Sequence, residues 1–357
     1  MANTKRVLYR IMAWTMKVGM AGALLSGCAT IGDTTDRMPT AAAKQPLEKT
    51  AWLVDWQWKA GAEDLRQMTD GLTSVQMFAA YFDESDDLYF TKAFQDALPK
   101  VQDVAKKSSL VHLDLTIVND QLRKDGSESQ KDPAIVSRLM ATEESRNRHI
   151  DQIMEAVSRY QFHGIEIDYE RIEEKDWEHV LAFYGELYRR LSAQDKTLRI
   201  VLEPRTPIEQ LSLPEGPVYV MMAYNLHGPS SDPGPKADRS FIAELASRMK
   251  KVPGKKVIAL SAGGFDWSEG GEVTALTETQ AAELAKSSLE MPRRNNASGS
   301  LHFTYLDQEQ RKHTVWYADE TTLQTWADAV WQEGYDIALW RLGDLSPGSV
   351  RLMNQSK

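Results

Sequence analysis

The sequence predicts an α/β fold, a closed parallel (β/α)₈ barrel of the TIM type, and three observations lead to this prediction. Short apolar runs of strand length alternate with longer segments whose apolar residues recur every three or four positions. About 300 residues remain after a polar N-terminal stretch, a length that one such barrel commonly has. Acidic and aromatic residues directly follow several of the short runs, and barrels of this kind carry their sites there.

Eight short runs have the apolar content and the polar flanks of buried strands. They are Trp52–Trp56, Ser74–Ala80, Val111–Val118, Gly164–Tyr169, Leu198–Leu202, Val218–Met222, Val257–Ser261 and Ile337–Trp340. Because helix-like segments separate them, we expect the strands to run parallel and to close into a barrel.

Six segments between these strands show helical periodicity. They are Thr91–Lys107, Glu143–Tyr160, Lys175–Leu191, Phe241–Lys250, Thr277–Ser288 and Glu320–Gln332. Two further runs, Leu301–Leu306 and His313–Tyr317, flank a polar turn and predict a β-hairpin. The hairpin lies before the last predicted helix, so we expect a small insertion in that connection.

One predicted strand carries three carboxylates on the same face. Glu166, Asp168 and Glu170 alternate with Ile165 and Ile167, and successive side chains of a strand point to opposite sides. Three like charges are costly in a packed core but suit a strand end that opens into a polar cleft. Their repulsion raises at least one pKa, which keeps a carboxylic acid protonated for acid catalysis near neutral pH.

The segment His163–Glu170 resembles the catalytic strand of the family 18 glycoside hydrolases, whose pattern is Asp-Gly-x-Asp-x-Asp-x-Glu. The last Asp and the Glu of the pattern are kept as Asp168 and Glu170, whereas His163 and Glu166 replace the first and second Asp. We count Glu166 among the substrate-binding residues. Other segments similar to this family follow in order, so the resemblance covers most of the chain and implies a chitinase-like hydrolase.

The resemblance also implies a mechanism. Family 18 enzymes use the 2-acetamido group of the substrate itself as the nucleophile. Glu170 would then be the general acid, and Asp168 would orient the acetamido nitrogen. The two side chains lie about 6–7 Å apart along one strand face, so both can reach one sugar ring. No metal and no cofactor is implied.

A second segment, Val220–Asn225, resembles the Met-x-Tyr-Asp segment of the family. Tyr224 would donate its hydroxyl to the acetamido oxygen as charge develops there. Asn225 replaces the common Asp and would bind the substrate without a charge. The alternative for Tyr224 is an aromatic residue at the rim that packs beside Met222.

Aromatic residues at other strand ends are candidates for binding sugar. Trp340 resembles the eighth-strand Trp that forms the floor of the sugar subsite, and a flat indole suits the apolar face of a pyranose. A core position is the alternative for this residue. Trp56 and Tyr81, at the ends of the first two strands, are expected to line neighbouring subsites. Glu203 and Arg205 are expected to form an ion pair at the rim, and contact of either residue with sugar is the alternative.

The N-terminus predicts a lipoprotein signal. Residues 1–27 hold four basic and no acidic residues, followed by an apolar run that is too short to span a bilayer. The segment ends in Leu-Ser-Gly before Cys28, the only cysteine, and resembles a bacterial lipobox. We therefore expect lipidation at Cys28, a flexible tether over residues 28–49 and a barrel over residues 50–357. The predicted location is extracytoplasmic, on the outer membrane if the cell has two membranes.

The charge of the chain limits its partners. The net charge is -9, and removal of the signal leaves 38 basic against 51 acidic residues. Such a surface disfavours nucleic acid. The seven histidines have no metal-site spacing, so we predict no metal, and we expect a monomer.

The predicted function is that of a membrane-anchored, retaining hydrolase of β-linked N-acetylglucosamine glycans such as peptidoglycan or chitin. Two alternatives stay open. A barrel of this family can bind glycan without turnover, and a barrel hydrolase can act on a different acyl or glycosyl bond, because a fold alone does not define function.

Overall fold

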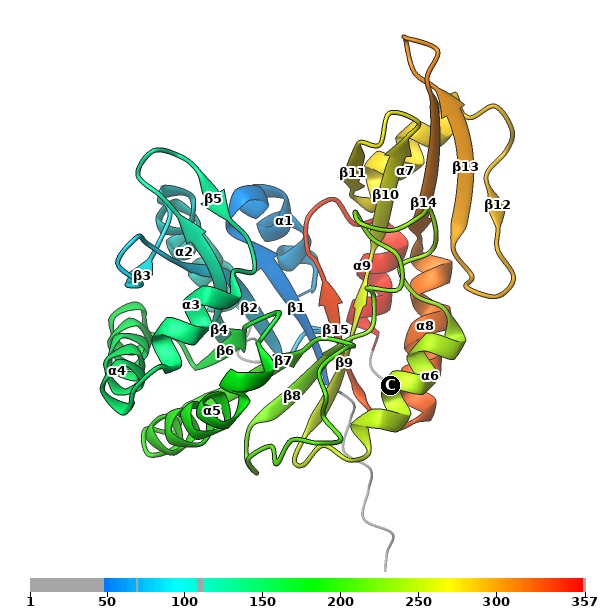
Figure 1. Ribbon diagram of the computed structural model, residues 1–357. Coiled ribbons are helices and arrows are strands. Elements are labelled where there is room, and N and C mark those ends of the chain that lie inside the picture. Colours follow the sequence, from blue (N-terminus) through cyan, green and yellow to red (C-terminus); the bar gives the residue numbers. More distant parts are fainter. Residues whose placement is uncertain (1–47, 69, 108–111, 356–357) are drawn as a thin grey trace, which may run out of the picture. The chain divides into compact units, whose positions relative to one another are not determined.

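The computed structural model describes residues 48–68, 70–107 and 112–355. Cys28, the predicted signal and nearly all of the predicted tether lie outside the described residues. Within them, eight parallel strands form a closed barrel, because β1 pairs with both β2 and β15, and β2 also pairs with β4 (Figure 1). The strands are β1 (Lys49–Val54), β2 (Ser74–Phe82), β4 (His112–Leu122), β6 (Gly164–Asp168), β7 (Thr197–Leu202), β8 (Val218–Met222), β9 (Lys256–Ser261) and β15 (Asp336–Trp340). All eight predicted strands and the barrel are confirmed.

Helices cover the outside of this barrel (Figure 1). They are α1 (Trp58–Met68), α2 (Lys92–Ala105), α3 (Pro133–Met140), α4 (Glu143–Tyr160), α5 (Trp177–Ser192), α6 (Arg239–Met249), α8 (Glu320–Gln332) and α9 (Pro347–Asn354). Helices α1, α3 and α9 were not predicted. The last two span only 8 residues each, which is too short for a strong periodic signal. Helix α1 is amphipathic, but it contains Gly61, which lowers its helix propensity.

Side-chain caps define where several of these helices begin. Thr91, Thr142, Asp238 and Asp319 each accept a hydrogen bond from a backbone N–H in the first turn of α2, α4, α6 and α8, respectively. Such caps satisfy N–H groups that have no partner within the helix. The helix starts are therefore encoded locally, even where the packing of the helix is not.

An insertion between β9 and α8 is larger than the predicted hairpin. Its antiparallel sheet has the order β11-β10-β14-β13-β12, with β10 (Gly263–Ser268), β11 (Val273–Leu276), β12 (Arg293–Arg294), β13 (Leu301–Leu306) and β14 (Lys312–Ala318). The predicted hairpin is β13–β14. Helix α7 (Glu278–Leu284), predicted as part of the barrel's helical layer, packs on this sheet, and Phe303, Tyr305 and Val315 belong to a separate small core with Ala281.

The hairpin prediction was too small because β10 begins with two glycines. A Cβ at Gly264 would lie 1.8 Å from the Trp316 carbonyl oxygen of the neighbouring strand. Glycine is therefore required for close strand contact here, although in a sequence it usually weakens a strand assignment.

A close approach also explains the glycine that opens β6. A Cβ at Gly164 would lie 2.8 Å from the Thr197 carbonyl oxygen on β7 and 2.9 Å from an Asp114 carboxylate oxygen on β4. The glycine lets β6 pack tightly between its two neighbours, and this packing determines where the carboxylates that follow it emerge.

Candidate active site

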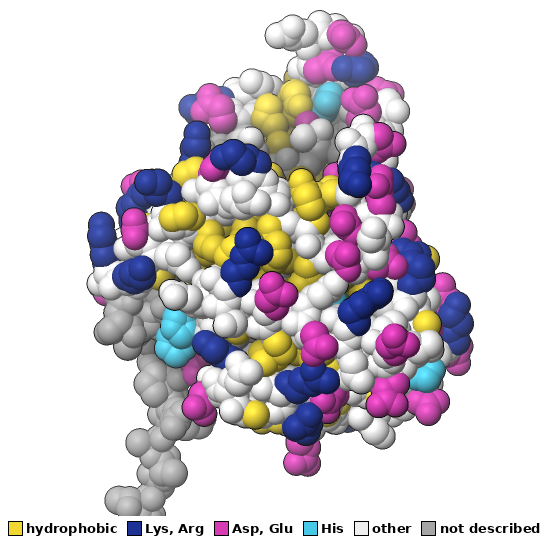
Figure 2. Space-filling view, turned by 90° about the vertical axis from the view of Figure 1, so that its left-hand side faces the viewer, with side chains coloured by type: hydrophobic (Ala, Val, Ile, Leu, Met, Phe, Trp, Pro, Cys, Tyr) yellow, Lys and Arg dark blue, Asp and Glu magenta, His cyan; other side chains and the backbone are white. Residues whose placement is uncertain are grey.

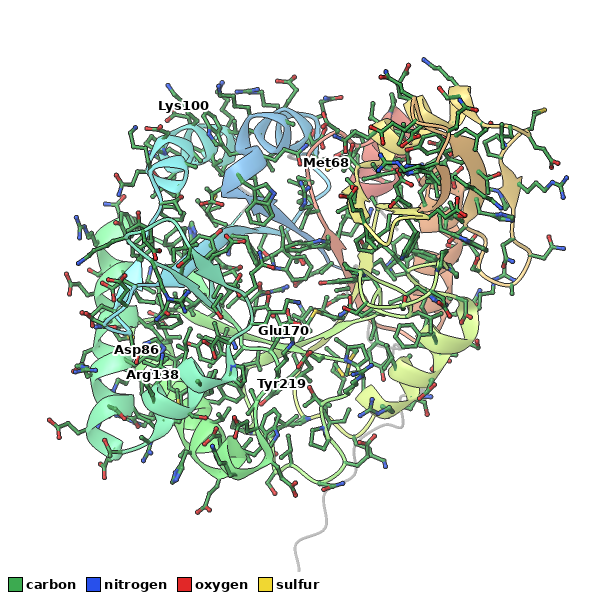
Figure 3. The ribbon with its side chains drawn as sticks, turned by 45° about the horizontal axis from the view of Figure 1, so that its top comes forward. Met68, Asp86, Lys100, Arg138, Glu170 and Tyr219 are labelled. Carbon is green, nitrogen blue, oxygen red and sulfur yellow. The ribbon has the colours of Figure 1, made fainter. Side chains whose placement is uncertain are left out.

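A cavity of ≈ 1120 Å³ opens at the carboxyl ends of the barrel strands. Figure 3 shows Glu170 near the middle of this opening, whereas Lys100 on α2 lies at the outer edge of the molecule. Seven of the eight residues predicted to contact substrate line the cavity: Trp56, Tyr81, Asp168, Glu170, Tyr224, Asn225 and Trp340. Barrel closure thus brings together side chains from the ends of five strands.

Asp168, the last residue of β6, is a buried carboxyl group that faces the cavity. Within the described residues its Oδ1 atom has no hydrogen-bond partner. Burial raises the pKa of Asp168 well above its usual value, and the charges of Glu170 and Glu166 add to this shift, while Lys131 opposes it. Ionisation of Asp168 is therefore less favourable than usual, and an unpartnered oxygen is available for a ligand.

Glu170 lies two residues after the end of β6, and the Asn119 side chain fixes its backbone through two hydrogen bonds. Its N–H donates to the Asn119 side chain (2.9 Å), and the Asn119 amide donates to its carbonyl oxygen (3.0 Å). The Glu170 carboxylate pairs with the Lys131 ammonium. Burial raises the pKa of Glu170, Lys131 lowers it, and the nearby Glu203 carboxylate raises it again. The net shift is upward, which suits a general acid.

Glu166 lies below the cavity and does not line it, in contrast to the predicted contact with substrate. Its side chain is fully buried, with an exposed fraction of 0%. The carboxylate pairs with Arg199 (2.9 Å) and accepts hydrogen bonds from Trp52 Nε1 (2.5 Å) and Thr116 Oγ1 (2.9 Å). These partners occupy the carboxylate inside the barrel, so Glu166 anchors the strand beneath Asp168.

His163, the other departure from the family pattern, also stands away from the cavity. Its Nδ1 accepts the Leu113 backbone N–H (3.1 Å), and its ring stacks on His112 with centroids 4.8 Å apart. This contact ties the start of β6 to β4. The change at this position therefore leaves the cavity lining untouched.

Tyr224 and Trp340 form an aromatic wall. Their rings lie nearly parallel, at 13°, with centroids 6.5 Å apart, and Trp340 also contacts Trp52 and Phe78 edge to face. Burial raises the pKa of Tyr224 well above its usual value, and the charges of Asp168 and Glu170 contribute. Its hydroxyl therefore stays protonated and can act as a donor. Asn225, beside Tyr224, is exposed at the cavity rim.

Trp56 and Tyr81 differ in what they offer a ligand. The Trp56 side chain is 56% exposed at the cavity mouth, and the Arg341 guanidinium lies 5.7 Å from its ring centroid. The Tyr81 hydroxyl already donates to Asp55 (3.0 Å). Trp56 therefore presents an open apolar face, whereas the polar tip of Tyr81 is engaged by the protein.

The predicted ion pair between Glu203 and Arg205 is not found among the described residues. Glu203 instead accepts the Arg171 backbone N–H (2.7 Å) and contributes to the shift at Glu170. Lys131 and Lys236 line the cavity from loops, and the sequence did not predict either of them as a site residue. No local motif marks either lysine, because their roles depend on residues that are distant in the sequence.

Two further properties concern the part of the chain that the structure describes. No grouping of three or more His, Cys, Asp or Glu side chains there could hold a metal ion. Among the described helices, none combines the length and the apolar composition that crossing a bilayer requires. Acidic and basic side chains are interspersed over the face shown in Figure 2.

A parallel barrel whose acidic strand end opens into an aromatic cavity is compatible with a glycosidase site. The family comparison agrees with this. The profile of glycosyl hydrolases family 18 matches residues 124–344, which is more than half of the chain, and the chain belongs to this family.

Similarity to individual proteins is lower. The uncharacterized glycosylase YvbX of Bacillus subtilis (strain 168) is 27% identical over 209 residues, a match that spans 54% of this chain and 61% of that relative's length. The structure is similar to the spore cortex-lytic enzyme SleL of Bacillus cereus, with a TM-score of 0.73 and 21% identity over 86% of this chain and 73% of that one. A chitinase from Chromobacterium violaceum ATCC 12472 gives a TM-score of 0.73 and 18% identity over 87% and 98%. Both structural similarities concern the fold.

Proposed function

We propose that this chain is a retaining glycosidase that cleaves β-linked N-acetylglucosamine glycans with the help of the substrate's own acetamido group. The observation that carries the proposal is the pair of Asp168 and Glu170, both with raised pKa, in an aromatic-lined cavity at the end of β6. A raised pKa keeps a carboxylic acid protonated at the pH where it must donate.

In the first step, Glu170 protonates the glycosidic oxygen while the acetamido oxygen attacks the anomeric carbon of the same sugar. The bond to the leaving sugar breaks, and a cyclic oxazolinium forms. Asp168 holds the acetamido nitrogen with its free oxygen, and the Tyr224 hydroxyl donates to the acetamido oxygen. Both interactions strengthen as charge develops, so they stabilise the transition state more than the bound substrate.

In the second step, water attacks the same anomeric carbon and gives its proton to the Glu170 carboxylate. The ring opens, the acetamido group is restored, and the product keeps the β configuration. Two inversions at one carbon give net retention, so the stereochemistry of the first product reports on this route.

The substrate we favour is peptidoglycan or a similar surface glycan. The lipobox-like segment before Cys28 supports a membrane anchor and an extracytoplasmic location, where such glycans occur. The similarity in fold to an enzyme described as spore cortex-lytic and to a chitinase is compatible with either glycan. The aromatic faces of Trp340 and Trp56 suit the apolar faces of sugars in both.

Glu170→Gln provides the test, because glutamine keeps the shape of the side chain but delivers no proton. On N-acetylglucosamine oligomers and purified peptidoglycan, the variant should lose about 10²–10⁴-fold in kcat while still binding glycan. Glu174→Gln, an exposed carboxylate in the short 3₁₀ helix η2 (Glu174–Asp176) that follows, is the matched control. An activated aryl glycoside should be partly spared.

Three outcomes would contradict the proposal. Fresh product that proton NMR shows as the α-anomer would mean an inverting mechanism. Wild type and Glu170→Gln that are equally inert but bind glycan would favour a binding protein. Activity that does not require the 2-acetamido group would point to a hydrolase of a different bond.

A further inference from the structure

Lys236 lines the cavity from the loop between β8 and α6, on a different wall from Glu170. Its ammonium donates to Ser261 Oγ (2.9 Å) and to the Ala262 carbonyl oxygen (3.1 Å), at the end of β9. In the barrel order, β8 and β7 separate β9 from β6. The lysine therefore belongs to a part of the cavity that is distinct from the carboxylate pair.

This ammonium has no counter-ion in the part of the chain that the structure describes. Both of its acceptors are neutral, and none of the ion pairs includes it. Lys131, the other lysine of the cavity, is paired with Glu170. Burial lowers the pKa of Lys236 to about 7, and the charge of Arg341 adds to the effect, as expected for a cation without a carboxylate partner.

An ammonium group has three donors, and the two hydrogen bonds to Ser261 and Ala262 leave one unused. A desolvated charge without a partner is costly, and an anion that binds beside it removes that cost. The Phe265 ring also lines the cavity, and its centroid lies 4.9 Å from the Lys236 nitrogen. An apolar face next to a cation suits a carboxylate on a short aliphatic group.

We infer that Lys236, Ser261 and Phe265 form a subsite for a carboxylate carried by the glycan, with Lys236 as the residue that selects acidic over neutral substrates. The inference rests on the proposed function. In a peptidoglycan strand, the lactyl ether of every second amino sugar ends in such a carboxylate wherever no stem peptide is attached, whereas chitin carries no carboxylate. The subsite therefore makes peptidoglycan the better substrate of the two.

The test compares two substrates of equal length: an alternating N-acetylglucosamine and N-acetylmuramic acid strand freed of stem peptides, and a neutral N-acetylglucosamine oligomer. In Lys236→Gln, the ratio of kcat/KM for the acidic strand to that for the neutral oligomer should fall by about 10- to 100-fold, the range for loss of one charge-assisted hydrogen bond. Lys236→Arg should keep most of the preference. Lys100→Gln, at the edge of the molecule in Figure 3, should match wild type.

A second arm uses the wild-type protein only, so it does not depend on how a variant folds. Reduction of the lactyl carboxyls to alcohols should lower kcat/KM by about tenfold or more. An unchanged ratio in Lys236→Gln, together with no effect of reduction, overturns the inference and leaves Lys236 as a link between the loop and β9. A wild type that is inert on both substrates overturns the proposed function instead.

Discussion

Replacing Lys131 by Met should move the alkaline limb of the pH dependence of kcat/KM upward. Glu170 must be protonated to act as the acid, so activity falls as the pH rises through its pKa. Lys131 favours the charged form of Glu170 and lowers that pKa, whereas burial and Glu203 raise it. Without the ammonium, the pKa of Glu170 rises further, and the enzyme stays active to a higher pH.

The geometry of the pair determines the size of the shift. A cation this close to a carboxyl group changes the pKa by about 1–3 units. The Glu170 side chain is only 9% exposed, but that of Lys131 is 40% exposed. Solvent screens the exposed partner, so the lower end applies, and we expect about one unit, or roughly 1.4 kcal/mol.

The assay is kcat/KM on a neutral N-acetylglucosamine oligomer from about pH 4 to about pH 9, because this parameter reports the pKa values of the free enzyme. Lys131→Arg keeps the charge and should hold the limb near its wild-type position. The Lys131 backbone N–H donates to Asp120 (2.7 Å) in any variant, so the loop should keep its path. A limb that stays in place or moves to lower pH in Lys131→Met would refute the reasoning.

Three further predictions concern the acetamido partner, the barrel interior and the membrane anchor. Asp168→Asn should lower kcat far more than it weakens glycan binding, since the charge it stabilises develops in the transition state, and equal losses by kinetics and calorimetry would indicate a gripping role instead. Arg199→Met should cost about 3–5 kcal/mol of unfolding free energy in urea, because Glu166 stays buried without its cation, whereas Arg189→Met on the surface should cost far less. Similar losses of stability in the two variants would contradict this prediction. Cys28→Ala should abolish incorporation of labelled palmitate, and continued labelling would show that the lipid lies elsewhere.

Features that depend on neighbouring residues could be predicted from the sequence. The eight barrel strands, the β13–β14 hairpin and the placing of Asp168 and Glu170 at a strand end follow from period-two alternation and short apolar runs. The insertion was underestimated because glycines obscure β10. Helices α3 and α9 were missed because they are short, and α1 was missed because Gly61 lowers the helix propensity of an otherwise amphipathic segment.

The contacts that the side chains at and beneath the cavity make could not be predicted from the sequence. Alternation correctly placed Glu166 on the same face of β6 as Asp168 but could not show that Trp52, 114 positions away, and Arg199, 33 positions away, would enclose it. It likewise gave no sign that Lys131 would pair with Glu170 or that no carboxylate among the described residues would pair with Lys236. A strand pattern determines which way a side chain points, because that depends on the backbone of its own residues. Closure of the barrel determines what the side chain meets, because only closure brings distant strand ends together, and the charge state of each cavity residue depends on those neighbours.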